Sequence, residues 1–139
     1  MRESSIQETC CDFLALDGWR RIRTDMKQLR GMGVQEKGMA DDLFIRYRLS
    51  GNHVPANYCG IVMAEVFWVE WKSKKGVHGQ KQDEWQLLER SRGALVWVAK
   101  KDFEPTVEGF SEHYTRSGLL RKAGLQIGAT RRKREVAQG

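Results

Sequence analysis

Apolar residues recur along the chain with two periods, and each period predicts one kind of element. In residues 3–16, Ile6, Cys10, Phe13 and Leu14 stand at helical spacing, which predicts an amphipathic helix with one buried stripe. The same spacing predicts two further helices, over residues 80–92 and 105–114.

The helix predicted over residues 80–92 precedes Gly93, a residue typical of a helix stop. Its buried stripe is predicted to hold Trp85 and Leu88, with Leu87 beside them. The last helix is predicted to open at Pro105, because proline is well tolerated in a first helical turn.

Extended segments lie between these helices. The sequence WRRIRTD, directly after Gly18, predicts a short strand, and the apolar residues 43–45 predict the core of a second strand. The apolar run from Ala64 to Lys72 predicts a third, buried strand. A fourth is predicted over residues 94–99, where the run is continuously apolar.

The connections predict how these strands pair. Residues 48–60 are rich in Gly, Asn and Pro, which favours antiparallel pairing of the second and third strands. The helix before the fourth strand favours a parallel crossover. Residues 25–38 have no clear period and predict a loop. The sequence therefore predicts an α/β fold with a mixed central sheet flanked by helices.

The third strand ends in Glu70-Trp71-Lys72, where apolar residues give way to charged ones. Side chains two apart in a strand share a face, so Glu70 and Lys72 should lie side by side with Trp71 on the opposite face. For this pair alone, a salt-bridged strand end is the commoner interpretation. Other acidic residues change that balance.

Further carboxylates come from other predicted elements: Glu3 from the first helix, and Asp41 or Asp42 from just before the second strand. Taken singly, Glu3 suits the first turn of a helix and the two aspartates suit a turn. Together with Glu70 they offer the oxygen ligands that magnesium needs, usually one or two carboxylates plus waters and a substrate phosphate.

Length and composition bound the class of protein. The chain of 139 residues is long enough for one domain with a sizeable core, and it contains no apolar run of membrane-spanning length. The polar start MRESSIQE does not suit a signal peptide, so we expect a soluble, cytoplasmic protein. The three cysteines show no Cys-x-x-Cys spacing and are expected to be reduced.

Positive charge is concentrated at the C-terminal end. Residues 115–139 hold seven Lys and Arg against one Glu, whereas residues 1–114 are balanced, within a net charge of +6 for the chain. A basic tail on a neutral body suggests an anionic partner, most plausibly nucleic acid, although a solvated terminus has the same composition.

Four motifs in order, GMADDLFI, VFWVEWK, QKQDEW and RGALVWVA, resemble the VRR-NUC branch of the PD-(D/E)XK nucleases. That branch includes the nuclease domain of the Fanconi-associated nuclease and small stand-alone phage and bacterial proteins. The first helix is similar as well, in ESSIQETCCDFLALDGW, so the resemblance covers roughly residues 3–103. It implies a restriction-endonuclease-like core of order αβββαβ. Residues 1–114 would form the nuclease domain and residues 115–139 a basic tail.

The resemblance also implies roles for individual residues. Asp41 and Glu70 would bind the metal, together with the backbone carbonyl of Trp71, and Lys72 would serve the attacking water. Two further residues would complete the site, namely Glu3 as the helical acid and Gln82 as a supporting glutamine.

The metal-binding aspartate is chosen by register. The family pattern Gly-x-Pro-Asp fits Gly38-Met39-Ala40-Asp41, with Ala40 in place of the usual proline. Asp42 therefore remains the alternative ligand.

The expected activity is a magnesium-dependent, structure-selective DNA endonuclease of the Holliday-junction-resolvase type, with manganese as a possible replacement. A homodimer would suit a four-way junction, because both have two-fold symmetry. The alternatives are a nuclease-like module that binds nucleic acid without cutting it, and a structural protein with a salt-bridged strand end. The residues predicted to contact the sugar-phosphate backbone of the nucleic acid are Arg20, Arg21, Arg23, Lys27, Arg30, Lys74, Lys75, Lys81, Arg131, Arg132, Lys133 and Arg134.

Overall fold

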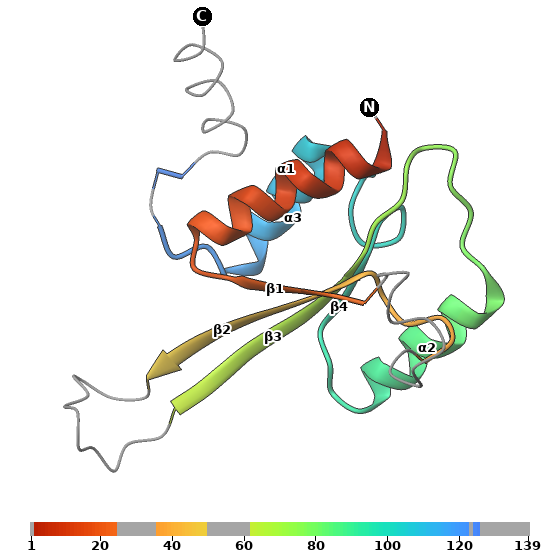
Figure 1. Ribbon diagram of the computed structural model, residues 1–139, viewed down its shortest axis with the longest axis horizontal. Coiled ribbons are helices and arrows are strands. Elements are labelled where there is room, and N and C mark those ends of the chain that lie inside the picture. The colour runs from red at the N-terminus through yellow and green to blue at the C-terminus, as the bar shows by residue number, and fades with distance from the viewer. Residues whose placement is uncertain (1, 25–35, 50–61, 123, 126–139) are drawn as a thin grey trace, which may run out of the picture.

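The computed structural model describes residues 2–24, 36–49, 62–122 and 124–125. They form a mixed α/β fold in which helices flank one sheet (Figure 1). In chain order the elements are α1 (Glu3–Leu16), β1 (Arg20–Arg23), β2 (Asp42–Leu49), β3 (Val62–Glu70), α2 (Gln80–Ser91), β4 (Val96–Val98) and α3 (Val107–Ser117).

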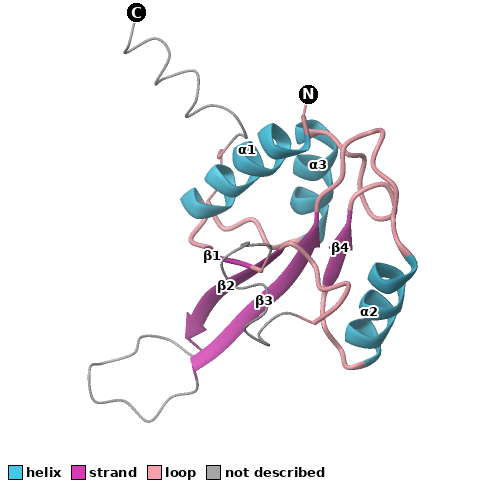
Figure 2. Ribbon diagram, turned by 45° about the vertical axis from the view of Figure 1, so that its right-hand side comes forward, coloured by secondary structure: helices cyan, strands magenta, loops and turns pink. Residues whose placement is uncertain are grey.

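The described strands form a four-stranded sheet in the order β1-β2-β3-β4 (Figure 2). β1 pairs with β2 and β2 with β3 in antiparallel fashion, whereas β3 and β4 are parallel. The predicted order of elements and the mixed sheet are thus confirmed. The parallel pair is possible because α2 carries the chain back across the sheet between β3 and β4.

The two faces of the sheet have separate cores. α1 and α3 lie together on one face and α2 on the other (Figures 1 and 2). Alternation along β3 divides its side chains between them, because Phe67 and Val69 pack with α1 and α3 whereas Trp68 packs with Trp85 of α2. Phe67 lies at the centre of the larger core, where its ring contacts those of Trp19, Phe44 and Trp97.

Several boundaries differ from the prediction, and those at the end of β3 and the start of α3 have a clear cause or consequence. β3 spans Val62–Glu70, so Trp71 and Lys72 lie just beyond its last residue. α3 begins at Val107 rather than Pro105, since the hydroxyl of Thr106 accepts a hydrogen bond from the Gly109 amide and caps the helix.

The predicted buried stripe of α2 is wrong in part. Trp85 is buried, but Leu88 is 49% exposed and Leu87 is 68% exposed. The buried residues of this helix are Trp85 and Gln86. The helix packs over the edge strand β4, so a narrower part of its surface is covered than the apolar spacing suggested.

Some predictions concern residues outside the described part. The loop predicted over residues 25–38 falls mostly there, as do most of 48–60 and the third cysteine, Cys59. Cys10 and Cys11 are free and buried. Burial raises the pKa of both thiols, so both stay protonated at neutral pH.

No helix among the described residues is long and apolar enough to span a membrane.

Asp17 joins the end of α1 to the C-terminal segment. Its carboxylate, 4% exposed as a residue, accepts hydrogen bonds from the Tyr114 hydroxyl and from the backbone amides of Arg121 and Lys122, and it pairs with Arg46. Burial alone would raise the pKa of Asp17, but these hydrogen bonds and the Arg46 charge outweigh it and hold the pKa below its usual value.

Asp17→Ala is expected to lower the free energy of unfolding by about 3 kcal/mol at neutral pH, because it removes the acceptor for several buried donors. A depressed pKa contributes stability above the unfolded pKa of about 4, and this contribution is lost as the pH falls. The difference between Asp17→Ala and wild type should therefore shrink between about pH 7 and about pH 3, as measured by urea unfolding.

The matched control is Asp12→Ala, which removes an exposed aspartate of the same helix and should change stability by less than about 0.5 kcal/mol. Equal effects of the two substitutions would contradict the role given to Asp17.

Candidate active site

The start of β2 and the end of β3 lie next to each other at one end of the sheet. Asp42, the first residue of β2, pairs with Val69, so Asp41 and Glu70 are neighbours across the two strands. The backbone amide of Trp71 donates a hydrogen bond of 3.0 Å to Oδ2 of Asp41. The antiparallel register therefore brings together two acids that are far apart in the sequence.

Glu70 is 1% exposed, and its two carboxylate oxygens have different surroundings. Oε1 accepts a hydrogen bond of 2.7 Å from Nε2 of Gln82 and lies 3.3 Å from Nζ of Lys72. Oε2 is buried and has no hydrogen-bond partner within the described part of the chain. A buried acceptor without a partner is costly, so this oxygen marks a place where a cation or donor would be favourable.

The charge of Glu70 is destabilised by its surroundings. Burial raises the pKa of Glu70 to about 8, with a further contribution from the negative charge of Asp41. The positive charge of Lys72, together with hydrogen bonds from Lys72 and from the Asp41 backbone, opposes this shift without cancelling it. One lysine therefore does not compensate two carboxylates, and without a cation Glu70 stays largely protonated at neutral pH.

Gln82 is fixed by the start of α2. Its Oε1 accepts a hydrogen bond of 3.0 Å from the Gly79 amide, which leaves the Nε2 group directed to Glu70. The helix start thus orients the amide that holds the buried carboxylate.

Gly38 brings the segment before Asp41 against this helix start. Its φ of +80° is a left-handed conformation, and an added Cβ would lie 2.1 Å from the backbone oxygen of Lys81. Only glycine fits such an approach. In the sequence this residue served only to set the register of Asp41, because a close backbone contact leaves no signal in an apolar pattern.

Asp42 belongs to the opposite face of the sheet. It is fully buried and accepts hydrogen bonds from Gln7 at 2.9 Å, from Nε of Arg21 at 2.8 Å and from the indole of Trp71 at 2.8 Å. Its acceptor positions are filled by protein donors, which favours Asp41 over Asp42 as a metal ligand. The contact with Gln7 was not predicted, since it depends on how α1 sits on the sheet.

Glu3 is separate from this cluster in the described contacts. It lies in the first turn of α1, and no hydrogen bond or ion pair joins it to Glu70 or Lys72. Ile6, one turn further along α1, lines a cavity of about 350 Å³ together with Ser73 and Lys74, so this end of α1 faces the loop after β3. The catalytic role of Glu3 stays a prediction.

The predicted nucleic-acid contacts have different surroundings. Arg21 is held by Asp42 and Glu8, which gives it a structural role, and Lys81 lies 3.5 Å from Glu84. The exposed side chains among them are those of Arg20, Arg23, Lys74, Lys75 and Lys81. Those that lie outside the described residues are Lys27, Arg30, Arg131, Arg132, Lys133 and Arg134.

Among the described residues, no group of three or more His, Cys, Asp and Glu side chains is arranged to hold a metal ion. Asp41 and Glu70 supply two carboxylates, which is within the number that magnesium takes from a protein. Comparison with models of protein families gave no match, and comparisons with curated proteins and with solved structures gave no significant similarity.

Glu70 should make metal-free stability depend on pH. Its folded pKa of about 8 lies above the unfolded value of about 4, so the folded state binds more protons between the two, and stability falls as the pH rises through this window. As the pH rises from about 5 to about 8, the free energy of unfolding of Glu70→Gln should increase relative to that of wild type by on the order of 2 kcal/mol. Urea unfolding with chelator present measures this difference.

Glu84→Gln is the control, because Glu84 is an exposed glutamate of α2. Its pH profile should match that of wild type. A Glu70→Gln profile parallel to wild type would show that the buried carboxylate does not have the raised pKa assigned to it.

Proposed function

We propose that the protein is a metal-dependent nuclease that hydrolyses phosphodiester bonds at the site formed by Asp41, Glu70 and Lys72. The observation that carries the proposal is the buried Oε2 of Glu70, which has no partner in the described part of the chain and lies beside a second carboxylate. The order α1-β1-β2-β3-α2-β4 is compatible with the restriction-endonuclease-like core that the sequence resemblance implies.

A divalent cation would fit this pair of acids. Magnesium takes one or two carboxylates plus waters and a phosphate oxygen, so Asp41 and Glu70 suffice, and manganese accepts the same ligands. When bound, the ion would supply an acidified water and neutralise charge on the phosphate. The carbonyl of Trp71 remains a predicted third ligand.

Lys72 and Gln82 have distinct roles in this proposal. Gln82 holds Oε1 of Glu70, which leaves Oε2 for the metal. Lys72 lies 3.3 Å from the same Oε1, and its flexible stem lets the ammonium orient a water or stabilise the developing charge on the phosphate.

The proposed substrate is DNA, probed first with branched forms. The exposed Lys74 and Lys75 follow Lys72 after a single serine, and lysines of this kind bind phosphates without reading sequence. Structure selectivity and a two-fold dimer come from the resemblance and from the symmetry of a four-way junction.

Cleavage of a labelled four-way junction, a flap and a linear duplex, in Mg²⁺ or in chelator, tests the proposal. Asp41→Asn and Glu70→Gln should each lower the cleavage rate by at least about a hundredfold, because each removes a metal ligand. Asp42→Asn should instead lower stability, and its folded fraction should still cut. The junction should be cut fastest.

Glu84→Gln again serves as the control and should cut like wild type. Tight binding that survives chelation without any cutting, unchanged in Glu70→Gln, would contradict the nuclease and favour a non-catalytic nucleic-acid-binding module. Equal cleavage of linear and branched DNA would leave the nuclease standing and remove its junction selectivity.

A further inference from the structure

The turn that follows β4 carries an exposed lysine, Lys100, in an unusual backbone conformation. Its φ is +73°, and among the described residues it is the only one other than glycine with a positive φ. L residues other than glycine seldom adopt this left-handed conformation, and glycine adopts it without steric penalty. A lysine in this conformation is a reason to ask what its side chain does.

The turn is held firmly by its own hydrogen bonds. The Lys100 amide donates to the Phe103 carbonyl at 2.8 Å, and the amides of Lys101 and Asp102 donate to the Val98 carbonyl at 3.1 and 2.8 Å. The carboxylate of Asp102 accepts from the Val98 amide at 2.7 Å. Because the turn is fixed independently of the Lys100 side chain, glycine could replace this lysine without loss of the fold.

Lys100 is connected to the proposed active site in two ways. The amide of Ala99 donates a hydrogen bond of 3.0 Å to the backbone oxygen of Glu70, which fixes the turn beside the end of β3. The Lys100 ammonium donates to the backbone oxygen of Gly76, and a Cβ on Gly76 would lie 3.1 Å from Cδ of Lys72. Lys72 and Lys100 therefore flank the same short segment of the loop after β3.

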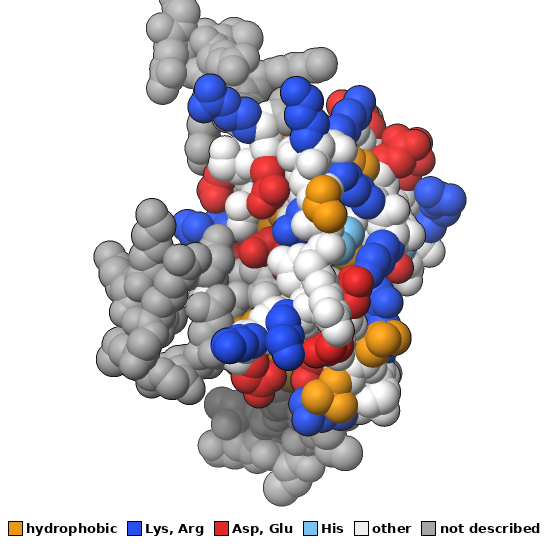
Figure 3. Space-filling view, turned by 90° about the vertical axis from the view of Figure 1, so that its right-hand side faces the viewer, with side chains coloured by type: hydrophobic (Ala, Val, Ile, Leu, Met, Phe, Trp, Pro, Cys, Tyr) orange, Lys and Arg blue, Asp and Glu red, His pale blue; other side chains and the backbone are white. Residues whose placement is uncertain are grey.

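The charges around this turn do not cancel evenly. Lys and Arg side chains are interspersed with Asp and Glu on the face that Figure 3 shows, so a simple basic patch does not single out a contact. The ion pairs distinguish the charged side chains from one another. Lys101 is bound to Asp83, Arg116 lies 3.6 Å from Glu112, and Asp102 is bound by Arg90.

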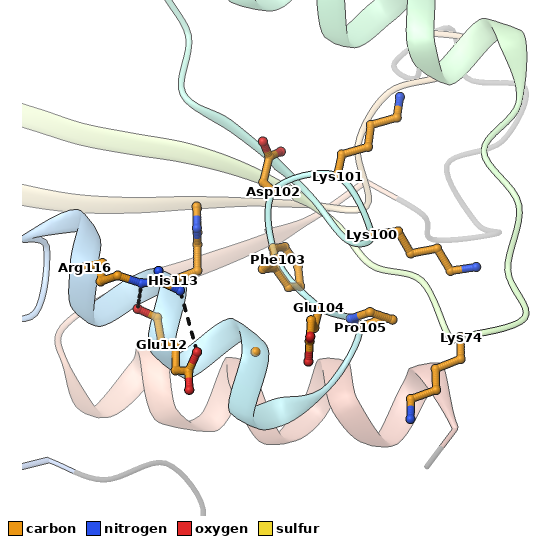
Figure 4. Close-up of a pocket in the computed structure, with 11 residues that line it drawn as sticks. Lys74, Lys100, Lys101, Asp102, Phe103, Glu104, Pro105, Glu112, His113 and Arg116 are labelled. Atoms are coloured by element: carbon orange, nitrogen blue, oxygen red, sulfur yellow. Dashed lines mark hydrogen bonds and ion pairs between the residues drawn. The ribbon is translucent and has the colours of Figure 1, made fainter.

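Lys74 and Lys100 have no acidic partner within the described residues. Both line a cavity of about 670 Å³. Of the three carboxylates that line it, Asp102 and Glu112 form ion pairs, and only Glu104 has none within the described structure. In Figure 4, Lys100 extends from its turn toward the loop that carries Lys74, and Lys101 turns toward α2. The side chain of Lys74 extends away from Lys100 in the same view. The cavity thus keeps a net positive charge next to the active site.

We propose that Lys100 binds a backbone phosphate of the nucleic-acid substrate next to the phosphate that is cleaved, and that Lys74 adds to the positive charge around it. This inference rests on the proposed nuclease function. The Lys100 ammonium uses one donor on the Gly76 oxygen, which leaves two donors for phosphate oxygens. The fixed turn and the hydrogen bond to the Gly76 oxygen hold this ammonium in place before substrate arrives, so little ordering is needed on binding.

Lys100→Gly is the decisive variant because it has opposite effects on stability and on binding. The melting temperature should stay equal to wild type or rise, because glycine relieves the strain at this φ. Affinity for a DNA duplex, measured in chelator so that no cutting occurs, should fall on the order of three- to tenfold. The slope of log affinity against log salt should lose about 0.9, the value for one phosphate contact.

Two variants control this experiment. Lys100→Arg keeps the charge and should retain the wild-type salt slope. Arg92→Ala removes one positive charge from the far end of α2, where Arg92 pairs with Glu89, and should leave slope and affinity unchanged. A Lys100→Gly protein that binds with wild-type affinity and slope overturns the inference.

The two proposals can fail separately. If wild type cuts DNA in Mg²⁺ and Lys100→Gly binds normally, the nuclease stands and the phosphate contact falls. If wild type binds but never cuts, and Lys100→Gly binds more weakly with a smaller slope, the phosphate contact stands and the nuclease falls. Wild type that binds no DNA overturns both.

Discussion

The arrangement of the site depends on how Trp71 is held between two neighbouring aspartates. Its backbone amide donates to Asp41 on one side, and its indole donates to the buried Asp42 on the other. Since Glu70 and Lys72 flank Trp71 in the chain, fixing this one residue fixes the direction of both. The fold thus uses a large core side chain to set the position of two small polar groups.

The neighbouring Asp41 and Asp42 have different surroundings because their side chains point to opposite faces of the sheet. Asp42 is surrounded by donors from α1, β1 and the end of β3, so its burial is compensated by hydrogen bonds. Asp41 and Glu70 face each other with Lys72 nearby, and the buried Oε2 of Glu70 has no partner in the described structure. A carboxylate kept in that state is destabilising on its own, and such sites are where functional groups concentrate.

The pattern along β3 was sufficient to predict that Glu70 and Lys72 share a face with Trp71 opposite. It could not choose between Asp41 and Asp42, because that choice depends on the pairing of β2 with β3. Leu88 was placed in the core wrongly, since helical spacing does not say how much of α2 the sheet covers. The left-handed Lys100 has no sequence signal, because its conformation arises from hydrogen bonds of the whole turn.

The most direct test of the proposed metal site is a crystal structure grown with Mn²⁺ in place of Mg²⁺, with anomalous scattering used to locate the ion. A manganese peak should lie between Oε2 of Glu70 and the carboxylate of Asp41, with Gln82 still on Oε1. The peak should be absent from crystals of Glu70→Gln. A wild-type structure from crystals grown in saturating Mn²⁺ with no ion at these oxygens, or with an ion bound by Asp42 instead, would contradict a metal site at Asp41 and Glu70.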